Sequence, residues 1–321
     1  MALSEVDWLA LLDSINNNQC TPFIGPEVCK PYLPTDKDIA KDWAECHKYP
    51  LDDSSQLSRV AQYLTITKKS LPKISLRDIL ELQNLPNFNS RENKDSPYSV
   101  LARLNMPIYI TTNYDKLMQI CLKDSGKEPH SEFCIWNDWL RDYVKNVEFP
   151  TALNKTYKPT VDNPIVYHLN GIVTFPESMV LTEKDYFDFL IYLSREGDQV
   201  FPSVIRTDLA RNTYLFIGYR LEDTSFLAMF VGITTAIKRL EKRGEVGSSI
   251  AVQFNSSINQ SNRKEIEEYL NEYTNDLFNI RVHLGDPFEF SKELNQRWEK
   301  YKNTLDESKN RLLKNYPISG W

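Results

Sequence analysis

Six short apolar segments, each followed at once by a polar residue or a glycine, recur along this chain of 321 residues. Short apolar runs are typical of strands that helices cover on both faces, as in parallel sheets. Because helical patterns alternate with these segments, the chain is predicted to have an α/β fold with a Rossmann-like, doubly wound parallel sheet of about six strands. The six segments are 21–24, 108–110, 165–167, 214–217, 249–254 and 280–284.

The residues that follow these segments are the first candidates for a functional site. The carboxyl ends of parallel strands gather along one edge of the sheet, where open α/β folds bind their ligands. Polar or glycine residues stand at all six ends, and their joint pattern is a stronger signal than any one of them. These residues are Gly25, Asn113, His168, Gly218, Asn255 and Gly285.

The segment 107–115 carries the densest polar cluster at a strand end. An apolar run precedes Thr111-Thr-Asn-Tyr-Asp115, and helical spacing resumes directly afterwards. An ordinary helix cap has the same composition, because Asn and Asp are common capping residues. At 21–29, a strand, a glycine turn and a following helix are the arrangement that brings backbone N–H groups to a phosphate. A single glycine is equally typical of an ordinary β-turn.

Composition and charge bear on several classes of function. The chain has 38 Lys and Arg against 44 Asp and Glu, a net charge of −6, which gives no support for a nucleic-acid or membrane surface. No apolar run approaches the ~20 residues of a membrane span, and the first residues lack a signal-peptide pattern. The five cysteines contain no C-x-x-C pair and the four histidines are isolated, so we expect no metal site and a cytoplasmic protein with reduced thiols.

The pattern of helices also suggests how the chain is organised. We expect one domain over residues 1–295, with a helical insertion at roughly 30–105 and an irregular segment at 123–163. A charged helix over 296–321 would follow it. This helix is compatible with a partner attachment surface and equally with a plain solvated helix.

Several of these segments, in this order, resemble the bacterial zinc-free branch of the sirtuin-like NAD-binding domain. They resemble its first glycine loop, its Asn-hydrophobic-Asp motif, its catalytic histidine motif, its Gly-Tyr loop and its adenosine-side loops. The corresponding segments are 23–29, 112–115, 167–171, 216–225, and 254–255 with 285–286. The resemblance covers about residues 5–295 and implies a domain without a zinc module.

The resemblance implies roles for individual residues. Asn113 and His168 would be catalytic: Asn113 would orient the ribose or the attacking water, and His168 would act as general base or ribose-hydroxyl partner. Without the resemblance, His168 would be read as an ordinary histidine with satisfied hydrogen bonds at a strand end. Asp115 would hold the nicotinamide. The residues implied to bind NAD+ are Gly25, Tyr114, Asp115, Gly218, Tyr219, Asp223, Phe254, Asn255, Gly285 and Asp286.

The chain departs from the family pattern in its first loop. Glu27 replaces the second glycine of that loop, and Cys29 replaces its serine. Glu27 brings a negative charge to the place where backbone should approach a pyrophosphate. NAD+ binding should therefore be weakened or reshaped unless the side chain of Glu27 points away.

The resemblance also implies an activity, the hydrolysis of NAD+ to nicotinamide and ADP-ribose. Domains of this kind commonly deplete NAD+ in anti-phage defence, held inactive until homo-oligomerisation or a sensor partner releases them. Such a partner would be a hexameric ATPase or a nucleic-acid-sensing protein, so we expect no direct contact with nucleic acid or membrane. NAD+ would be the substrate, and no metal would take part.

Two other functions remain open. The chain could be an NAD-dependent protein deacylase, although the missing pair of C-x-x-C motifs speaks against the acyl-peptide cleft that such enzymes use. It could also be a non-catalytic module that binds NAD or ADP-ribose. The presence of Glu27 in the first loop favours this alternative.

Overall fold

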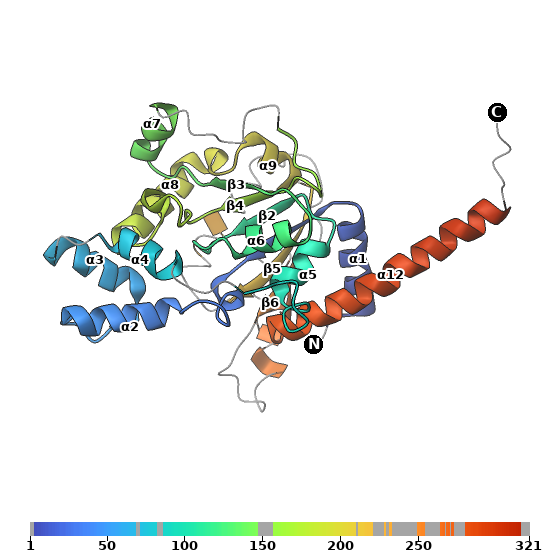
Figure 1. The fold of residues 1–321 in the computed structure, drawn as a ribbon, viewed down its shortest axis with the longest axis horizontal. Helices are drawn as coiled ribbons and strands as arrows, with labels where there is room; N and C mark the ends of the chain where they lie inside the picture. Colours follow the sequence, from blue (N-terminus) through green and yellow to red (C-terminus); the bar gives the residue numbers. More distant parts are fainter. Residues whose placement is uncertain are drawn as a thin grey trace.

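The structure is a computed structural model in which seven parallel strands form one sheet, in the order β3-β4-β2-β1-β5-β6-β7 (Figure 1). It describes residues 3–68, 71–81, 86–146, 157–209, 211–220, 228, 231–232, 249–253, 264–266, 268–269, 271–272 and 280–315. The predicted Rossmann-like parallel sheet is confirmed. Its strands are β1 (Cys20–Ile24), β2 (Ile108–Thr111), β3 (His130–Phe133), β4 (Ile165–His168), β5 (Thr213–Tyr219), β6 (Ser249–Gln253) and β7 (Ile280–Leu284).

The segment 123–163, expected to be irregular, instead contains strand β3 and helix α7 (Asp138–Asn146). Strand β3 lies at the edge of the sheet, where β4 is its one partner among the described strands. Edge strands are commonly short and polar, and this one reads His-Ser-Glu-Phe. The apolar pattern of a buried strand is therefore missing from its sequence.

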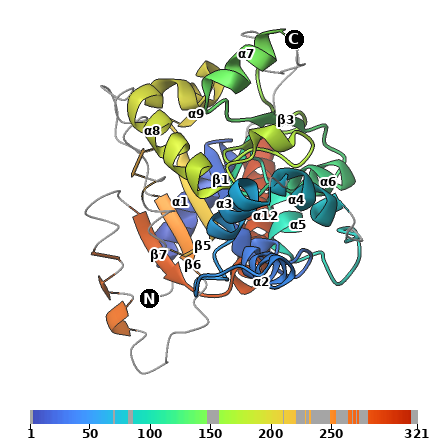
Figure 2. The same cartoon turned by 90° about the vertical axis from the view of Figure 1, so that its left-hand side faces the viewer.

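Both faces of the sheet are buried, which explains the continuous apolar runs. Ile108 and Ile110 of β2 contribute to one core, and Tyr109 between them contributes to the other. Successive side chains of a strand point to opposite faces, so each face needs its own helical cover. The core that includes Tyr109 is closed by α1 (Glu5–Asn16), α5 (Pro97–Arg103), α6 (Leu117–Asp124) and the start of α12 (Pro287–Asn315). The other is closed by α7, α8 (Glu183–Val200) and α9 (Ser203–Leu209), which Figure 2 shows on the far side of the sheet from α5 and α12.

A separate helical layer lies between β1 and β2 in the chain. It consists of α2 (Asp36–His47), α3 (Leu57–Thr67) and α4 (Pro72–Glu81), which share an apolar cluster of their own. Met179 and Leu181, from the segment after β4, complete that cluster. The layer is thereby fastened beside the carboxyl ends of the strands, and α2 begins there.

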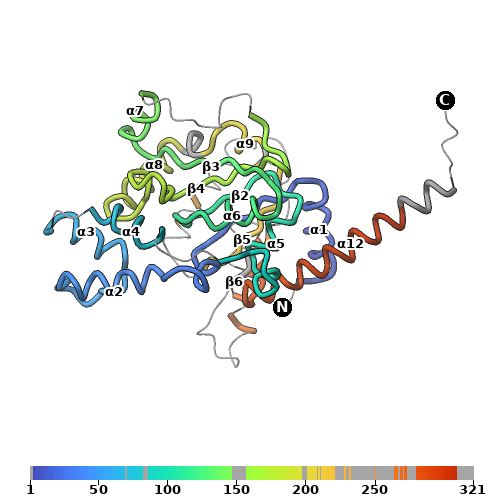
Figure 3. The backbone as a smooth tube through the Cα atoms, in the orientation of Figure 1, coloured from blue at the N-terminus to red at the C-terminus, as the bar shows by residue number. Residues whose placement is uncertain are grey.

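The boundary expected at residue 296 falls inside α12. The first half of this helix packs on α1 through Phe290, Leu294 and Trp298, which are buried and spaced four residues apart. Trp8 stacks on Phe290 with ring centroids 5.1 Å apart, so this half belongs to the domain core. The second half extends away from the rest of the molecule (Figure 3). Neither α12 nor any other helix in the described part of the chain is long and apolar enough to cross a membrane.

Candidate functional site

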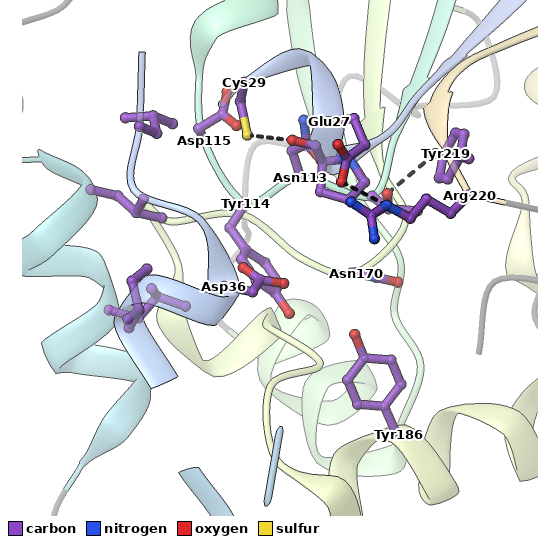
Figure 4. A pocket seen from close by; sticks show the side chains of 16 residues that line it. Glu27, Cys29, Asp36, Asn113, Tyr114, Asp115, Asn170, Tyr186, Tyr219 and Arg220 are labelled. Atoms are coloured by element: carbon purple, nitrogen blue, oxygen red, sulfur yellow. Dashed lines mark hydrogen bonds and ion pairs between the residues drawn. The ribbon is translucent and has the colours of Figure 1, made fainter. Parts of the chain in front are cut away.

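A cavity of about 170 Å³ opens at the carboxyl ends of the central strands (Figure 4). Strand β1 is the point where the strand order reverses, because β2 lies on one side of it and β5 on the other. Open α/β sheets bind ligands at this position. Of the predicted site residues, those that line the cavity are Asn113, Tyr114, Asp115 and Tyr219.

Asn113 is 7% exposed and is held in place from three sides. Its Nδ2 donates to the carbonyl of Gly25 at 3.1 Å and to the Tyr98 hydroxyl at 3.3 Å. Its backbone N–H donates to Thr111 Oγ1 at 3.0 Å. None of the described residues donates to Asn113 Oδ1, so this oxygen is available to a ligand in the cavity.

His168 lies behind Asn113 and does not line the cavity. Its side chain is fully buried, with Nδ1 2.9 Å from the backbone oxygen of Asn113 and Nε2 against the side-chain amide of Gln119. Burial lowers the pKa of His168 to about 4, so the ring is neutral at pH 7. A neutral ring that donates from Nδ1 and accepts at Nε2 satisfies both contacts. The structure therefore brings His168 to the back of the site and not to its open face.

Gly25 and Gly218 meet each other where β1 and β5 end. A Cβ atom on Gly25 would lie 2.5 Å from the carbonyl oxygen of Gly218, a distance that atoms do not tolerate. Gly218 also has φ of +81°, in the region that favours glycine. Neither residue lines the cavity, so close packing of the two loops is sufficient to explain why both are glycines.

Asp115 and Tyr114 line the cavity and also hold the surrounding backbone. Asp115 Oδ1 accepts the N–H of Leu117 at 2.8 Å, at the start of α6, and burial raises the pKa of this carboxyl to about 6. The Tyr114 hydroxyl donates to the carbonyl of Val180 at 2.7 Å. Both residues thus fix the turn that carries Asn113.

Asn170 lines the cavity and was not among the residues predicted from the sequence. It is 7% exposed, and its Oδ1 has no hydrogen-bond partner in the described structure. Buried polar atoms without partners are rare and commonly mark a place for a ligand. The signal in the sequence was weak, because an Asn-Gly pair after a strand is also an ordinary turn.

Glu27 lies in the wall of the cavity, and two cations surround its carboxylate. Arg220 Nε lies 3.3 Å from Glu27 Oε1, and Lys30 pairs with Oε2 (Figure 4 shows the Arg220 pair). The three side chains together carry a charge of +1. The negative charge expected to repel a pyrophosphate is therefore neutralised locally. The Cys29 thiol donates to the carbonyl of Pro26 at 3.1 Å, and burial raises its pKa, so it stays protonated.

The remaining predicted residues lie elsewhere. Gly285 and Asp286, at the end of β7, line a separate hollow beside the start of α12. Asp286 Oδ1 accepts the N–H of Phe288 at 2.7 Å and thereby caps this helix. Asp223, Phe254 and Asn255 lie outside the described residues. In the part of the chain that is described, no three His, Cys, Asp or Glu side chains are grouped so as to hold a metal ion.

The parallel sheet and the cavity at its switch point define an α/β protein of the Rossmann-like class. Residues 107–278, more than half of the chain, match the family model of the SIR2-like domain. The chain belongs to the SIR2-like domain family.

Three curated proteins are similar to this chain over part of its length, and each is named NAD(+) hydrolase ThsA. The protein of Cytobacillus dafuensis is 28% identical over 187 residues, covering 58% of this chain and 32% of the relative. That of Bacillus cereus (strain MSX-D12) is 24% identical over 159 residues, covering 50% of this chain and 29% of the relative. That of Enterococcus faecium is 26% identical over 147 residues, covering 46% of this chain and 26% of the relative. The matches span about a third of the length of these relatives or less.

Proposed function

We propose that this chain is an NAD+ hydrolase that cleaves NAD+ to nicotinamide and ADP-ribose. The observation that carries the proposal is the Asn113 amide, fixed at the switch point of the sheet with its Oδ1 available to a ligand. The family match and the names of the similar proteins support the same activity.

The reaction breaks the bond between C1′ of the ribose and N1 of nicotinamide. Nicotinamide leaves with the bonding electron pair, water adds to the positively charged sugar at C1′, and one proton is released. Asn113 Oδ1 would orient a ribose hydroxyl or the water, which is a positioning effect. Asp115 would contact the nicotinamide carboxamide from the same turn. Gly285 and Asp286, and with them Asp223, Phe254 and Asn255, remain proposed contacts for the rest of the dinucleotide.

His168 takes a different part from the general base that the resemblance implies. Its Nδ1 contacts the backbone oxygen of Asn113, and its ring has no access to the cavity. We therefore propose that His168 is a positioning residue, which holds the Asn113 turn in place. The glycines Gly25 and Gly218 would likewise support the site by their close packing.

The pyrophosphate would be bound by Arg220 and Lys30. Lys30 follows the first loop and Arg220 lines the cavity at the end of β5, and both pair with Glu27. Tyr219 supports this wall, since its hydroxyl donates to the carbonyl of Ile24 at 3.0 Å.

The biological setting is part of this proposal. The activity would serve anti-phage defence by NAD+ depletion in the cytoplasm. The lone chain would turn over NAD+ slowly, and homo-oligomerisation or a sensor partner would activate it. A hexameric ATPase or a nucleic-acid-sensing protein would suit that role. The projecting half of α12 offers a surface for such an attachment.

The test is nicotinamide release from NAD+ by the purified protein at high concentration, alone and co-expressed with proteins encoded beside it. We expect release that falls about 1,000-fold in Asn113→Ala, since positioned groups contribute effects of this size. Circular dichroism should show that the variant stays folded. Equal release by the variant would contradict the proposal.

The second candidate is a module that binds NAD+ or ADP-ribose without cleaving it. The burial of His168, away from the cavity, is the observation that favours it. Nucleotide binding without nicotinamide release under any of these conditions would establish this function instead. Loss of an acetyl group from a peptide, dependent on NAD+, would indicate a deacylase.

A further inference from the structure

Three carboxylates in the described structure line the cavity, and they differ in what holds them. Glu27 is paired with Arg220 and Lys30, and Asp115 accepts a backbone N–H at the start of α6. Asp36 has no hydrogen bond or ion pair with any other described residue. It is therefore the carboxylate that remains available to a ligand.

Local structure explains why Asp36 is free. It is the first residue of α2, and the helix is capped by its neighbours: Thr35 Oγ1 accepts the N–H of Asp38, and Asp38 in turn accepts the N–H of Thr35. This capping box satisfies the helix start without Asp36. Figure 4 shows the Asp36 carboxylate beside the ring of Tyr114, among the side chains that line the cavity.

A second, independent feature of the cavity indicates that a ligand is expected there. Asn170 is 93% buried, lines the same cavity, and has no partner for its Oδ1 in the described structure. Asp36, which is exposed overall, and Asn170 thus present oxygen atoms to the same cavity from two segments far apart in the chain. Such an arrangement favours a ligand that is positively charged or rich in hydrogen-bond donors.

We propose that Asp36 is a further catalytic residue, whose carboxylate faces C1′ of the nicotinamide ribose, stabilises the positive charge there and accepts the proton of the attacking water. The proposal rests on the proposed function. As the bond from C1′ to nicotinamide breaks, the bonding pair leaves with nicotinamide. Water then supplies the new oxygen at C1′, and its proton passes to Asp36 and on to solvent.

The protonation state of Asp36 suits this role. Asp36 is exposed overall, but the protein near its carboxyl desolvates that group and raises its pKa to about 6. The carboxyl is therefore ionised at pH 7, and its pKa lies close to the pH at which a general base works best. Asp36 interacts electrostatically with Cys29 and Tyr114. The other titratable groups that line the same cavity are Glu27, Asp115, Tyr186, Tyr219 and Arg220. Asp115 has a pKa of about 6 as well, so a pH profile alone would not separate the two residues.

The test is therefore a binding measurement that does not need turnover. By calorimetry at pH 8, the full-length protein is titrated with ADP-ribose and with an analogue whose terminal ribose carries a protonated amine in place of the ring oxygen. We expect the wild type to bind the cationic analogue about tenfold more tightly or better, because opposite charges attract strongly in a partly desolvated site. Asp36→Asn should bind the two ligands equally.

Asp38→Asn is the matched control, because Asp38 lies in the same helical turn but belongs to the capping box. It should lower the melting temperature and keep the preference for the cationic analogue. Retention of the full preference by Asp36→Asn would overturn the proposal. So would a purely structural effect, in which Asp36→Asn lowers the melting temperature alone.

Turnover separates this proposal from the proposed function. We expect Asp36→Asn to lower kcat about 100-fold with little change in KM, the effect of losing a general base. If the wild type shows the preference and Asp36→Asn loses it, but neither releases nicotinamide, the cation site stands and hydrolysis is wrong. If both release nicotinamide equally, hydrolysis stands and the role of Asp36 is wrong. If the wild type binds neither ligand, both are wrong.

Discussion

The ends of β2 and β4 lie side by side in the sheet, yet they present their polar residues in opposite ways. After β2, Asn113 and Asp115 enter the cavity. At β4, His168 is the last residue of the strand and faces the interior, and Asn170, two positions later, enters the cavity instead. The two ends are joined by the contact of His168 Nδ1 with the Asn113 backbone oxygen.

A polar residue at a strand end can therefore have one of two roles. One kind contacts the ligand, and the other fixes the turn that carries the first. A resemblance of motifs places both at the correct edge of the sheet, but it does not tell which side of the backbone each side chain occupies.

The largest expected effect is the loss of folding stability at low pH that the buried ring of His168 causes. In unfolded chains the pKa of His is about 6.5, whereas burial lowers that of His168 to about 4. As pH falls below 6.5, the unfolded state binds a proton that the folded state refuses until pH 4. The free energy of unfolding should therefore fall by about 3 kcal/mol over this window. Urea unfolding between pH 7.5 and 4 measures it.

His168→Asn is the reference for that measurement, because it lacks the titrating ring and keeps Asp36 and Asp115, whose raised pKa values act in the opposite direction. The wild type should lose stability relative to His168→Asn as pH falls through this window. Parallel curves would mean that His168 is exposed to solvent, and the distinction between the two strand ends would disappear.

A smaller effect is expected from Asn170. Asn170→Ala should lower nicotinamide release about 30-fold, a loss of about 2 kcal/mol in the transition state. It should change the free energy of unfolding by less than about 1 kcal/mol, because Oδ1 has no partner to lose. The control is Asn212→Ala, since buried Asn212 donates to Thr21 Oγ1 at 2.8 Å near the opposite edge of the sheet. That variant should lose stability and keep its specific activity, and the reverse pattern would argue against a ligand role for Asn170.

The smallest expected effect is a change in NAD+ affinity when Glu27 of the first loop is replaced. Glu27→Gln removes the carboxylate that holds Arg220 and Lys30. We expect NAD+ to bind about threefold to tenfold more tightly, because exposed cations released from a pair gain modest interactions with a phosphate. The gain should shrink at 0.5 M salt, where charges are screened. Weaker binding by the variant would show that Glu27 itself contacts the nucleotide.

Much of the fold follows from patterns that are local in the sequence. Apolar runs of three to six residues, separated by helical spacing, were sufficient to predict a parallel sheet with helices on both faces. Strand β3 escaped prediction because an edge strand buries little and its sequence is polar. The boundary expected at 296 lies within α12, where the buried residues Phe290, Leu294 and Trp298 form a stripe on a helix whose composition is mostly charged.

The sequence by itself determined the sheet, the edge at which a ligand would bind, and Asn113 as a residue at that edge. Local patterns decide these features, because burial on both faces makes a strand continuously apolar and burial on one face imposes a repeat of 3.6 on a helix. Only the tertiary structure decided that His168 turns inward, that Asn170 and Asp36 enter the cavity, and that Arg220 meets Glu27. These depend on turn geometry and on contacts between segments far apart in the chain, which no local pattern records.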